Sequence, residues 1–252
     1  MVTFVTALVK LPGQFRPMDV YCRLFDQLVA TGIPLRVYLD ESLRAYGDSL
    51  TAPNVRVVDY VTYRPPWAVQ LPRERHPTKD TVEYMQVQLR KLEFLVDACQ
   101  HTDDEFLAWI DFGILHMAQD LPRWTQRLQT IARSQFPRDR LLAPGSWPSG
   151  SYPVWDRVCW RFCGSFVLGH RSLLRPAFER QCELVVSGLP KITWEINYWS
   201  QMEEFFQVYR ADHNDTLLEG LLEWIEPKSA ETPQSTWQHP PEDAQTQSRL
   251  SE

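Results

Sequence analysis

The sequence predicts an α/β fold, in which one Rossmann-like domain has a central, mostly parallel sheet flanked by helices. Three observations support this prediction. Residues 2–39 read as strand, helix and strand, and a strongly apolar segment at 106–111 follows a long helical pattern. The chain also has 252 residues with 44% hydrophobic content, enough to bury one sizeable core. A strand–helix–strand unit implies parallel pairing through a right-handed crossover.

The first elements are defined by their hydrophobic periods. Val2–Val9 is almost entirely apolar or β-branched, as in a strand buried on both faces. Asp19–Ala30 places its apolar residues at helical spacing, and Gly32 is expected to end that helix. Two further strands are expected at Leu35–Leu39 and Val55–Val61.

The later elements follow from the same periods. The polar, proline-rich stretch Arg64–Lys79 is expected to be a loop, and its length is typical of binding loops and lids. Asp80–Gln100 is expected to form one long helix, and Phe106–Asp111 the most central strand. The remaining predicted elements are helices at 120–134, 172–187, 193–204 and 215–224, and strands at 141–143, 162–168 and 205–209.

The two ends of the chain differ in composition. The opening strand lacks a basic region and is interrupted by Lys10-Leu11-Pro12-Gly13, so a signal peptide is not expected. No apolar run approaches the roughly 18 residues that a membrane helix needs, so we expect a cytoplasmic protein without a transmembrane segment. Residues 227–252 are polar and are expected to form a disordered tail behind a folded domain at 1–226.

Charge and cysteine content argue against two classes of protein. The net charge is −6 and no basic stripe is present, so nucleic acid is not expected as a partner. The five cysteines are irregularly spaced, which argues against a disulfide framework.

Asp111 is the first candidate site residue. It ends an apolar strand, and ligands of open α/β sheets bind beyond the carboxyl ends of the strands. A carboxylate at that position can hold a divalent cation against a diphosphate, and Gly113 permits close approach of a ligand. The alternative is that Asp111 only caps the following turn.

A second polar group follows the strand predicted at 205–209. Asp212 and His213 combine a carboxylate with an imidazole, a pair that suits manganese-type ions. Asn214 and Asp215 stand where a helix N-cap is expected, so a structural role is the alternative for them.

Three further positions are candidates for ligand contact. Trp194, Glu195 and Trp199 combine aromatic rings with a carboxylate at helical spacing, as sugar recognition and general-base chemistry require, although Glu195 also suits a first helical turn. Gly164 in a predicted strand indicates close approach either of a ligand or of the backbone. Lys91 is long enough to reach a phosphate, but lysines on helices are usually solvated.

Several nucleotide and hydrolase motifs are absent. The chain has no Gly-x-x-x-x-Gly-Lys-Ser/Thr loop and no Gly-x-Gly-x-x-Gly after the first strand. It also lacks Gly-x-Ser-x-Gly. P-loop nucleotide hydrolysis, dinucleotide-dependent redox chemistry and α/β-hydrolase chemistry are therefore disfavoured.

Four blocks of the chain, taken together in their order and spacing, resemble the HtrL/YibB-like glycosyltransferase family. The resemblance covers roughly residues 1–225. The blocks are Val2-Thr3-Phe4-Val5-Thr6-Ala7, Trp109-Ile110-Asp111-Phe112-Gly113, Cys163-Gly164-Ser165-Phe166 with Gly169, and Thr193-Trp194-Glu195-Ile196-Asn197 followed by Asp212-His213-Asn214-Asp215.

The resemblance implies a GT-A-type fold and transfer of a sugar from a nucleotide-sugar donor to a glycan acceptor, in surface polysaccharide or glycoconjugate synthesis. Such enzymes usually carry an Asp-x-Asp motif, but here Trp109 and Gly113 occupy the two positions that would hold a second Asp beside Asp111. His213 matches the late histidine that completes the metal shell in many of them. Mn²⁺ or Mg²⁺ held by Asp111 and His213 is therefore expected.

These patterns lead to a specific hypothesis for the site. Asp111 and Glu195 are the expected catalytic residues, and Glu195 acts on the acceptor side as general base or orienting carboxylate. The residues expected to bind the donor nucleotide are Thr6, Ala7, Leu8, Lys91, Trp109 and Gly113. The residues expected to contact sugars are Trp194, Trp199, Gly164, Asn197 and Asp212.

Two other functions stay open at this point. A non-catalytic, GT-A-shaped module that binds glycans or nucleotides is favoured by the missing second Asp. A nucleotidyltransferase ranks third, because it needs a glycine-rich basic loop after the first strand. Residues 10–16 have a single glycine, Gly13.

Overall fold

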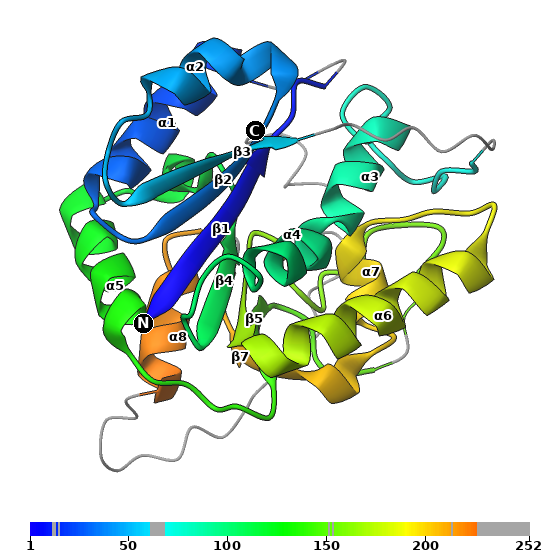
Figure 1. Cartoon of the computed structure of the whole chain (residues 1–252). Helices are drawn as coiled ribbons and strands as arrows, with labels where there is room; N and C mark the ends of the chain where they lie inside the picture. Colours follow the sequence, from blue (N-terminus) through cyan, green and yellow to red (C-terminus); the bar gives the residue numbers. More distant parts are fainter. Residues whose placement is uncertain are drawn as a thin grey trace.

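A seven-stranded sheet forms the centre of the computed structural model, which describes residues 1–11, 14, 16–60, 69–150, 152, 154–212 and 214–225 (Figure 1). The strands lie in the order β3-β2-β1-β4-β6-β5-β7. Strand β6 is antiparallel to both of its neighbours, and the other pairs are parallel. The strands are β1 (Val2–Leu8), β2 (Leu35–Asp40), β3 (Val55–Tyr60), β4 (Phe106–Ile110), β5 (Leu141–Gly145), β6 (Phe166–His170) and β7 (Phe206–Arg210).

Helices cover both faces of this sheet, as Figure 1 shows. One face carries α1 (Met18–Ala30), α2 (Arg44–Ser49), α5 (Leu121–Arg133) and α8 (Leu217–Ile225), and the other carries α3 (Val82–Leu89), α4 (Lys91–Ala98), α6 (Arg171–Gly188) and α7 (Glu195–Trp199). Short 3-10 turns occur at Glu41–Leu43, Ile114–Met117 and Glu203–Phe205. This helix–sheet–helix arrangement confirms the predicted α/β fold class, with a central, mostly parallel sheet flanked by helices.

The sheet has a hydrophobic core on each face. Along β1, Phe4 and Leu8 belong to the core beneath α1 and α5, whereas Val5 and Ala7 belong to the core beneath α4 and α6. This alternation follows from the two-residue period of a strand. It also explains why the opening segment is apolar at nearly every position, as predicted for a strand buried on both faces.

The chain reverses its direction of winding between β1 and β4. It steps outward from β1 to β2 and β3, and then returns through α3 and α4 to β4 on the other side of β1. Ligand sites of open α/β sheets form at such a reversal, beyond the carboxyl ends of the strands. The parallel pairing of β1 with β2, predicted from the strand–helix–strand unit, is confirmed.

The long helix predicted at 80–100 is interrupted. It consists of α3 and α4, with Arg90 between them at φ −87° and ψ 0°. The break frees the carbonyl of Leu89, which accepts a 2.7 Å hydrogen bond from the buried side chain of Gln181 on α6. A hydrophobic period does not report this interruption, because the apolar residues continue across it.

Two other predicted elements were too long or displaced. The strand expected at 162–168 lies at Phe166–His170, because its partner β4 ends at Ile110, which pairs with Phe166. The helix expected at 193–204 covers only Glu195–Trp199, and a separate 3-10 turn follows at Glu203–Phe205. Helix α2 was not predicted.

The other predictions agree with the structure to within a few residues at the ends of elements. Gly32 ends α1 in the left-handed region at φ 76°, as expected. The five cysteines are free thiols, which confirms that they form no disulfide framework. None of the helices in the described part of the chain is both long and apolar enough to cross a bilayer. The expected tail and the five residues 64–68 of the expected loop lie outside the described residues.

Candidate active site

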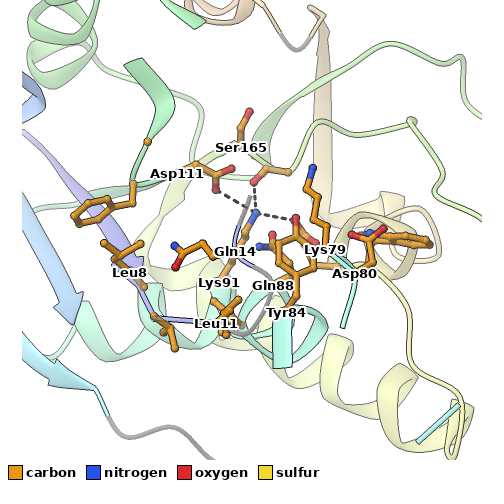
Figure 2. A pocket seen from close by; sticks show the side chains of 18 of the residues that line it. Leu8, Leu11, Gln14, Lys79, Asp80, Tyr84, Gln88, Lys91, Asp111 and Ser165 are labelled. Atoms are coloured by element: carbon orange, nitrogen blue, oxygen red, sulfur yellow. Dashed lines mark hydrogen bonds and ion pairs between the residues drawn. The ribbon is translucent and has the colours of Figure 1, made fainter. Parts of the chain in front are cut away.

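A cavity of about 340 Å³ lies at the carboxyl ends of β1 and β4. Its volume falls in the range of small-molecule sites, roughly 300–1,000 Å³. Its walls come from the ends of β1 and β4, from the region of α1, from residues 79–80 with α3 and the start of α4, and from the segments before β6 and at α7 (Figure 2). The lining includes Ala7, Leu8, Val9, Leu11, Gln14, Tyr84, Val87, Gln88, Lys91, Trp109, Asp111, Gly113, Val158, Trp160, Gly164, Ser165, Trp194, Glu195 and Ile196.

Lys91 lies at the centre of the cavity wall, and its side chain is only 2% exposed. Its Nζ donates to the carbonyl of Gly164 at 2.7 Å and to Oε1 of Glu195 at 2.7 Å. It also lies 3.3 Å from Oδ1 of Asp111 (Figure 2). A lysine ammonium has three hydrogens, so these three acceptors account for all of them.

Asp111 follows β4 directly and is held from several sides. Its backbone N–H donates to the carbonyl of Ser165 at 3.0 Å, and its own carbonyl accepts from Ile114 at 2.9 Å in the next turn. The indole of Trp109 donates to Oδ1 at 2.8 Å. The side chain stays 37% exposed, and within the described residues Oδ2 makes no hydrogen bond. Asp111 therefore presents one carboxylate oxygen to a ligand.

Glu195 is the first residue of α7 and is 3% exposed. It fits only because residue 164 is a glycine, since a Cβ at Gly164 would lie 2.1 Å from Oε1 of Glu195. The close approach predicted at Gly164 is therefore one between the backbone and a carboxylate of the site. Lys91, Glu195 and the Gly164 carbonyl form one compact polar group.

The electrostatics of this group follow from its burial. Burial alone would lower the pKa of Lys91, but the charges of Asp111 and Glu195 and their hydrogen bonds raise its pKa above the ordinary value. The lysine is therefore an ammonium across the physiological range. The group of Lys91, Asp111 and Glu195 has one acidic residue more than basic ones, and the cavity lining also contains Arg16, Lys79 and Asp80.

Most of the predicted site residues meet at this cavity. Gly113 lines it with ordinary backbone angles, φ −97° and ψ 20°, and a Cβ there would lie 3.1 Å from the ring of Tyr21, so close packing is the reason for this glycine. The predicted residues in the lining are Ala7, Leu8, Lys91, Trp109, Asp111, Gly113, Gly164, Trp194 and Glu195.

Four predicted residues lie away from the cavity lining, and their side chains have other partners or positions. Thr6 is fully buried in β1. Trp199 is 0% exposed and donates to Gln181 at 2.9 Å. Asn197 bonds the backbone of residues 154, 157 and 159. Asp212 accepts from the hydroxyl of Ser146 at 3.1 Å.

These positions affect two parts of the hypothesis. Because Trp199 has no exposed surface, a sugar shelf built from Trp194 and Trp199 does not form at the cavity. His213, the second expected metal ligand, lies outside the described residues. The N-cap alternative for Asn214 agrees with the structure, because its side chain accepts from the N–H of Thr216 at 2.8 Å just before α8.

The sequence interpretation missed residues from α3 and from the segment before β6. Tyr84, Gln88 and Lys91 line the cavity together, and their spacing of four and three residues on helical segments is a signal that the sequence contained. Burial, together with the charge of Glu195, holds the pKa of Tyr84 well above its ordinary value, so it stays a neutral hydroxyl. Trp160 gave no comparable signal, because it lies outside any regular element.

The described residues do not form a metal site by themselves. None of their His, Cys, Asp and Glu side chains gather in a group of three or more that could hold an ion. Asp111 keeps one oxygen without a hydrogen bond among the described residues, and its other oxygen is engaged by Lys91 and Trp109. Magnesium commonly binds through one or two carboxylates plus substrate phosphates and waters, which is the arrangement that this donor set allows.

Comparisons with known proteins show only distant likenesses. No protein-family model matches the sequence, and no curated protein matches it. Among solved structures, a 4-diphosphocytidyl-2C-methyl-D-erythritol synthase from Anaerococcus prevotii is 8% identical, with a TM-score of 0.45 and coverage of 89% of this chain and 96% of that chain. A nucleotidyl transferase from Methanothermobacter thermautotrophicus is 12% identical, with a TM-score of 0.47 and coverage of 90% and 97%.

A third likeness is to a glycosyltransferase involved in glycosylation of the major capsid of PBCV-1. It is 13% identical, with a TM-score of 0.40 and coverage of 84% of this chain and 81% of that chain. At such identities and scores, none of these activities can be assigned to this chain. The fold and the cavity define an α/β protein with a partly polar cavity at the reversal between β1 and β4, the place where open α/β sheets commonly bind ligands.

Proposed function

We propose that this chain is a glycosyltransferase that uses a nucleotide-sugar donor and transfers the sugar to a glycan acceptor. One observation carries the proposal: the group of Lys91, Asp111 and Glu195, in which Lys91 and Glu195 are buried, forms part of the wall of a ligand-sized cavity at the reversal of the sheet. Two carboxylates held apart by a lysine suit a reaction that needs one group near a diphosphate and another near an attacking hydroxyl. The resemblance to the HtrL/YibB-like family supports the same reaction.

The proposed roles follow the order of the cavity walls. Ala7 and Leu8, at the end of β1, contact the nucleoside. Asp111 lies next to them at the end of β4 and directs its free oxygen toward the diphosphate. Glu195 lies on the far side of Lys91 and orients or deprotonates the acceptor hydroxyl. Lys91 is a positioning residue, because its hydrogens are committed to its three protein acceptors.

We also propose that the site binds a divalent cation. Asp111 would hold Mn²⁺ or Mg²⁺ together with the diphosphate, and His213 is the second proposed ligand. A bound cation would offset the negative charge that the diphosphate adds to that of Asp111. Because the described residues supply few ligands, we expect the ion to bind firmly only when the nucleotide is present.

Ligand-induced stabilisation is the first test of this function. We expect one nucleoside diphosphate and its sugar conjugate to stabilise the protein by about 2.7 kcal/mol at a hundredfold excess over Kd, and Mn²⁺ to increase the shift. The measurement is thermal unfolding with the diphosphates of uridine, guanosine, cytidine, adenosine and thymidine, with and without Mn²⁺. Stabilisation by none of them would contradict the proposal.

Asp111→Asn is the matched variant for the chemical step. The amide keeps the size of Asp111 and an oxygen for the Trp109 indole, so the fold should be retained. We expect release of the free diphosphate from the nucleotide sugar to fall by about a hundredfold or more. Full turnover in this variant would exclude Asp111 from catalysis. Release of pyrophosphate from a nucleoside triphosphate and a sugar phosphate by the unaltered protein would instead identify a nucleotidyltransferase.

A further inference from the structure

Trp160 is an exposed aromatic residue at the cavity. Among the described residues the large hydrophobic side chains that are exposed are Met1, Val57, Trp160 and Val186. Trp160 is the aromatic member of that set, is 42% exposed, and lines the cavity. Leaving an indole in water forgoes the large stabilisation that its burial would give, so its exposure at a ligand cavity calls for an explanation.

The backbone that carries this indole is firmly held. The carbonyl of Trp160 accepts from the N–H groups of Ser146 at 3.3 Å and Trp147 at 3.1 Å. The next side chain, Arg161, donates from Nε to Glu203 at 2.9 Å and from Nη1 to the carbonyl of Trp147 at 2.8 Å. Gly145 packs so closely that a Cβ there would lie 2.1 Å from the carbonyl oxygen of Arg161.

An exposed ring on a hydrogen-bonded backbone is not what a frayed loop shows. A loop residue that is exposed because its surroundings are loose makes few backbone contacts. Trp160 instead has an anchored backbone and a ring that is free to contact a ligand. Pre-organised aromatic rings on rigid supports lose little conformational entropy on binding.

The position of Trp160 places it on the acceptor side. Ser146 and Trp147, which hold its carbonyl, follow strand β5, and the strands run in the order β1-β4-β6-β5. Strands lie about 4.8 Å apart, so this anchor is roughly 14 Å from β1. Asp111 follows β4, which lies between β1 and β5 in this order, so the proposed reacting end lies nearer to β1 than this anchor does. The ring therefore stands beyond the reacting end and not at the nucleoside end.

The neighbours of Trp160 in the lining suit a sugar ring. Trp194, Val158 and Glu195 also line the cavity, and Asn197 of α7 hydrogen-bonds the segment that precedes Trp160. The face of an indole is electron-rich, and the C–H groups on one face of a pyranose carry slight positive charge. The two surfaces therefore attract each other, and their contact excludes water. A carboxylate such as Glu195 accepts hydrogen bonds from the hydroxyls at the ring edge.

We propose that Trp160 is the platform on which a pyranose ring of the acceptor glycan stacks, with Glu195 facing the hydroxyls of that sugar. This inference rests on the proposed transferase function and assigns the substrate class of its acceptor side. It replaces the shelf formed by Trp194 and Trp199 with one that the cavity lining contains.

The test compares sugar binding with nucleotide binding in the full chain. The sugar probes are the methyl α- and β-pyranosides of glucose, galactose, mannose and N-acetylglucosamine, titrated by saturation-transfer NMR. The nucleotide probe is the diphosphate that stabilises the protein most. The variants are Trp160→Ala, Trp160→Phe and, as an exposed apolar control outside the cavity lining, Val186→Ala.

We expect Trp160→Ala to weaken glycoside binding by about tenfold or more, the size of one aromatic contact, and Trp160→Phe to weaken it by no more than about threefold. Val186→Ala should bind like the unaltered protein. The stabilisation by the diphosphate should be the same in all variants, which also shows that each variant is folded.

Three results would overturn the inference: no glycoside binds the unaltered protein, Trp160→Ala binds glycosides normally, or Trp160→Ala loses the response to the diphosphate. The last result would mean that the ring stacks on the nucleobase. If glycoside binding depends on Trp160 but no nucleotide stabilises the protein, the sugar platform stands and the transferase proposal fails.

Discussion

At the scale of single residues, Lys91 determines how the site is charged. It is the buried counter-charge for two carboxylates that come from different parts of the chain, Asp111 after β4 and Glu195 at the start of α7. Without it, Glu195 would be a nearly inaccessible carboxylate with no positive partner. Removing one member of a buried ion pair is far more costly than the pair itself is stabilising.

We predict that Lys91→Met lowers the free energy of unfolding by about 3–5 kcal/mol, because it leaves Glu195 buried and unpaired. Urea unfolding of the variant and the unaltered protein measures the loss. The control is the double variant Lys91→Met with Glu195→Gln, which should recover part of the loss; unchanged stability in the single variant would show that the ion pair is not formed.

At the scale of elements, the short helix α7 depends on one side chain. Asn197 is fully buried and joins α7 to residues 154–159, accepting from the N–H of Cys159 at 2.7 Å and donating to the carbonyls of Val154 at 2.7 Å and Arg157 at 2.9 Å. It thereby fixes the segment that leads into Trp160. The sequence predicted a ligand-binding role for Asn197, and the geometry shows a structural one.

We predict that Asn197→Ala destabilises the protein by about 2–4 kcal/mol, since several buried backbone groups lose their partner at once. The neighbouring Gln201→Ala, at an exposed position, should change stability by no more than about 0.5 kcal/mol. Chemical denaturation of the two variants side by side gives the comparison. Equal stability of both would mean that water replaces the lost hydrogen bonds.

The helices and strands also show which features of the fold the hydrophobic period predicts and which it does not. It located the strands and most of the helices, because burial on one or two faces leaves a direct pattern in the chain. It did not locate the break at Arg90. There the carbonyl of Leu89 accepts a hydrogen bond from the side chain of Gln181, a residue far along the chain. It also placed the strand at 162–168 several residues early, since only pairing with β4 sets where β6 begins.

At the scale of the whole molecule, buried titratable groups determine the response to alkali. Burial raises the pKa of Tyr209 well above its ordinary value of 10.0, and burial together with a hydrogen bond to Asp97 raises that of Tyr38. The two neighbouring carboxylates raise the pKa of Lys91 above its ordinary 10.5 despite its burial. Each group therefore keeps its proton longer in the folded protein than in the unfolded chain.

We predict that stability is constant with respect to these groups below pH 10 and falls above it, where the unfolded tyrosines and lysine release protons that the folded chain retains. Each such group contributes a slope of about 1.4 kcal/mol per pH unit between its two pKa values. Tyr209→Phe is the matched control, because its hydroxyl has no hydrogen-bond partner in the described structure. Urea unfolding above pH 10 should show a shallower slope for this variant, and an equal slope would contradict the assignment.

The sequence by itself determined the α/β class, the first strand–helix–strand unit and the position of Asp111 at the end of a central strand. These features depend on local periods and on a general rule for where sheets bind ligands. The tertiary structure alone decided the composition of the site. Lys91, Asp111 and Glu195 are brought together from α4, the end of β4 and α7. Trp199 is removed from solvent and Trp160 is left in it because packing between distant elements, and not spacing along the chain, decides which rings are covered.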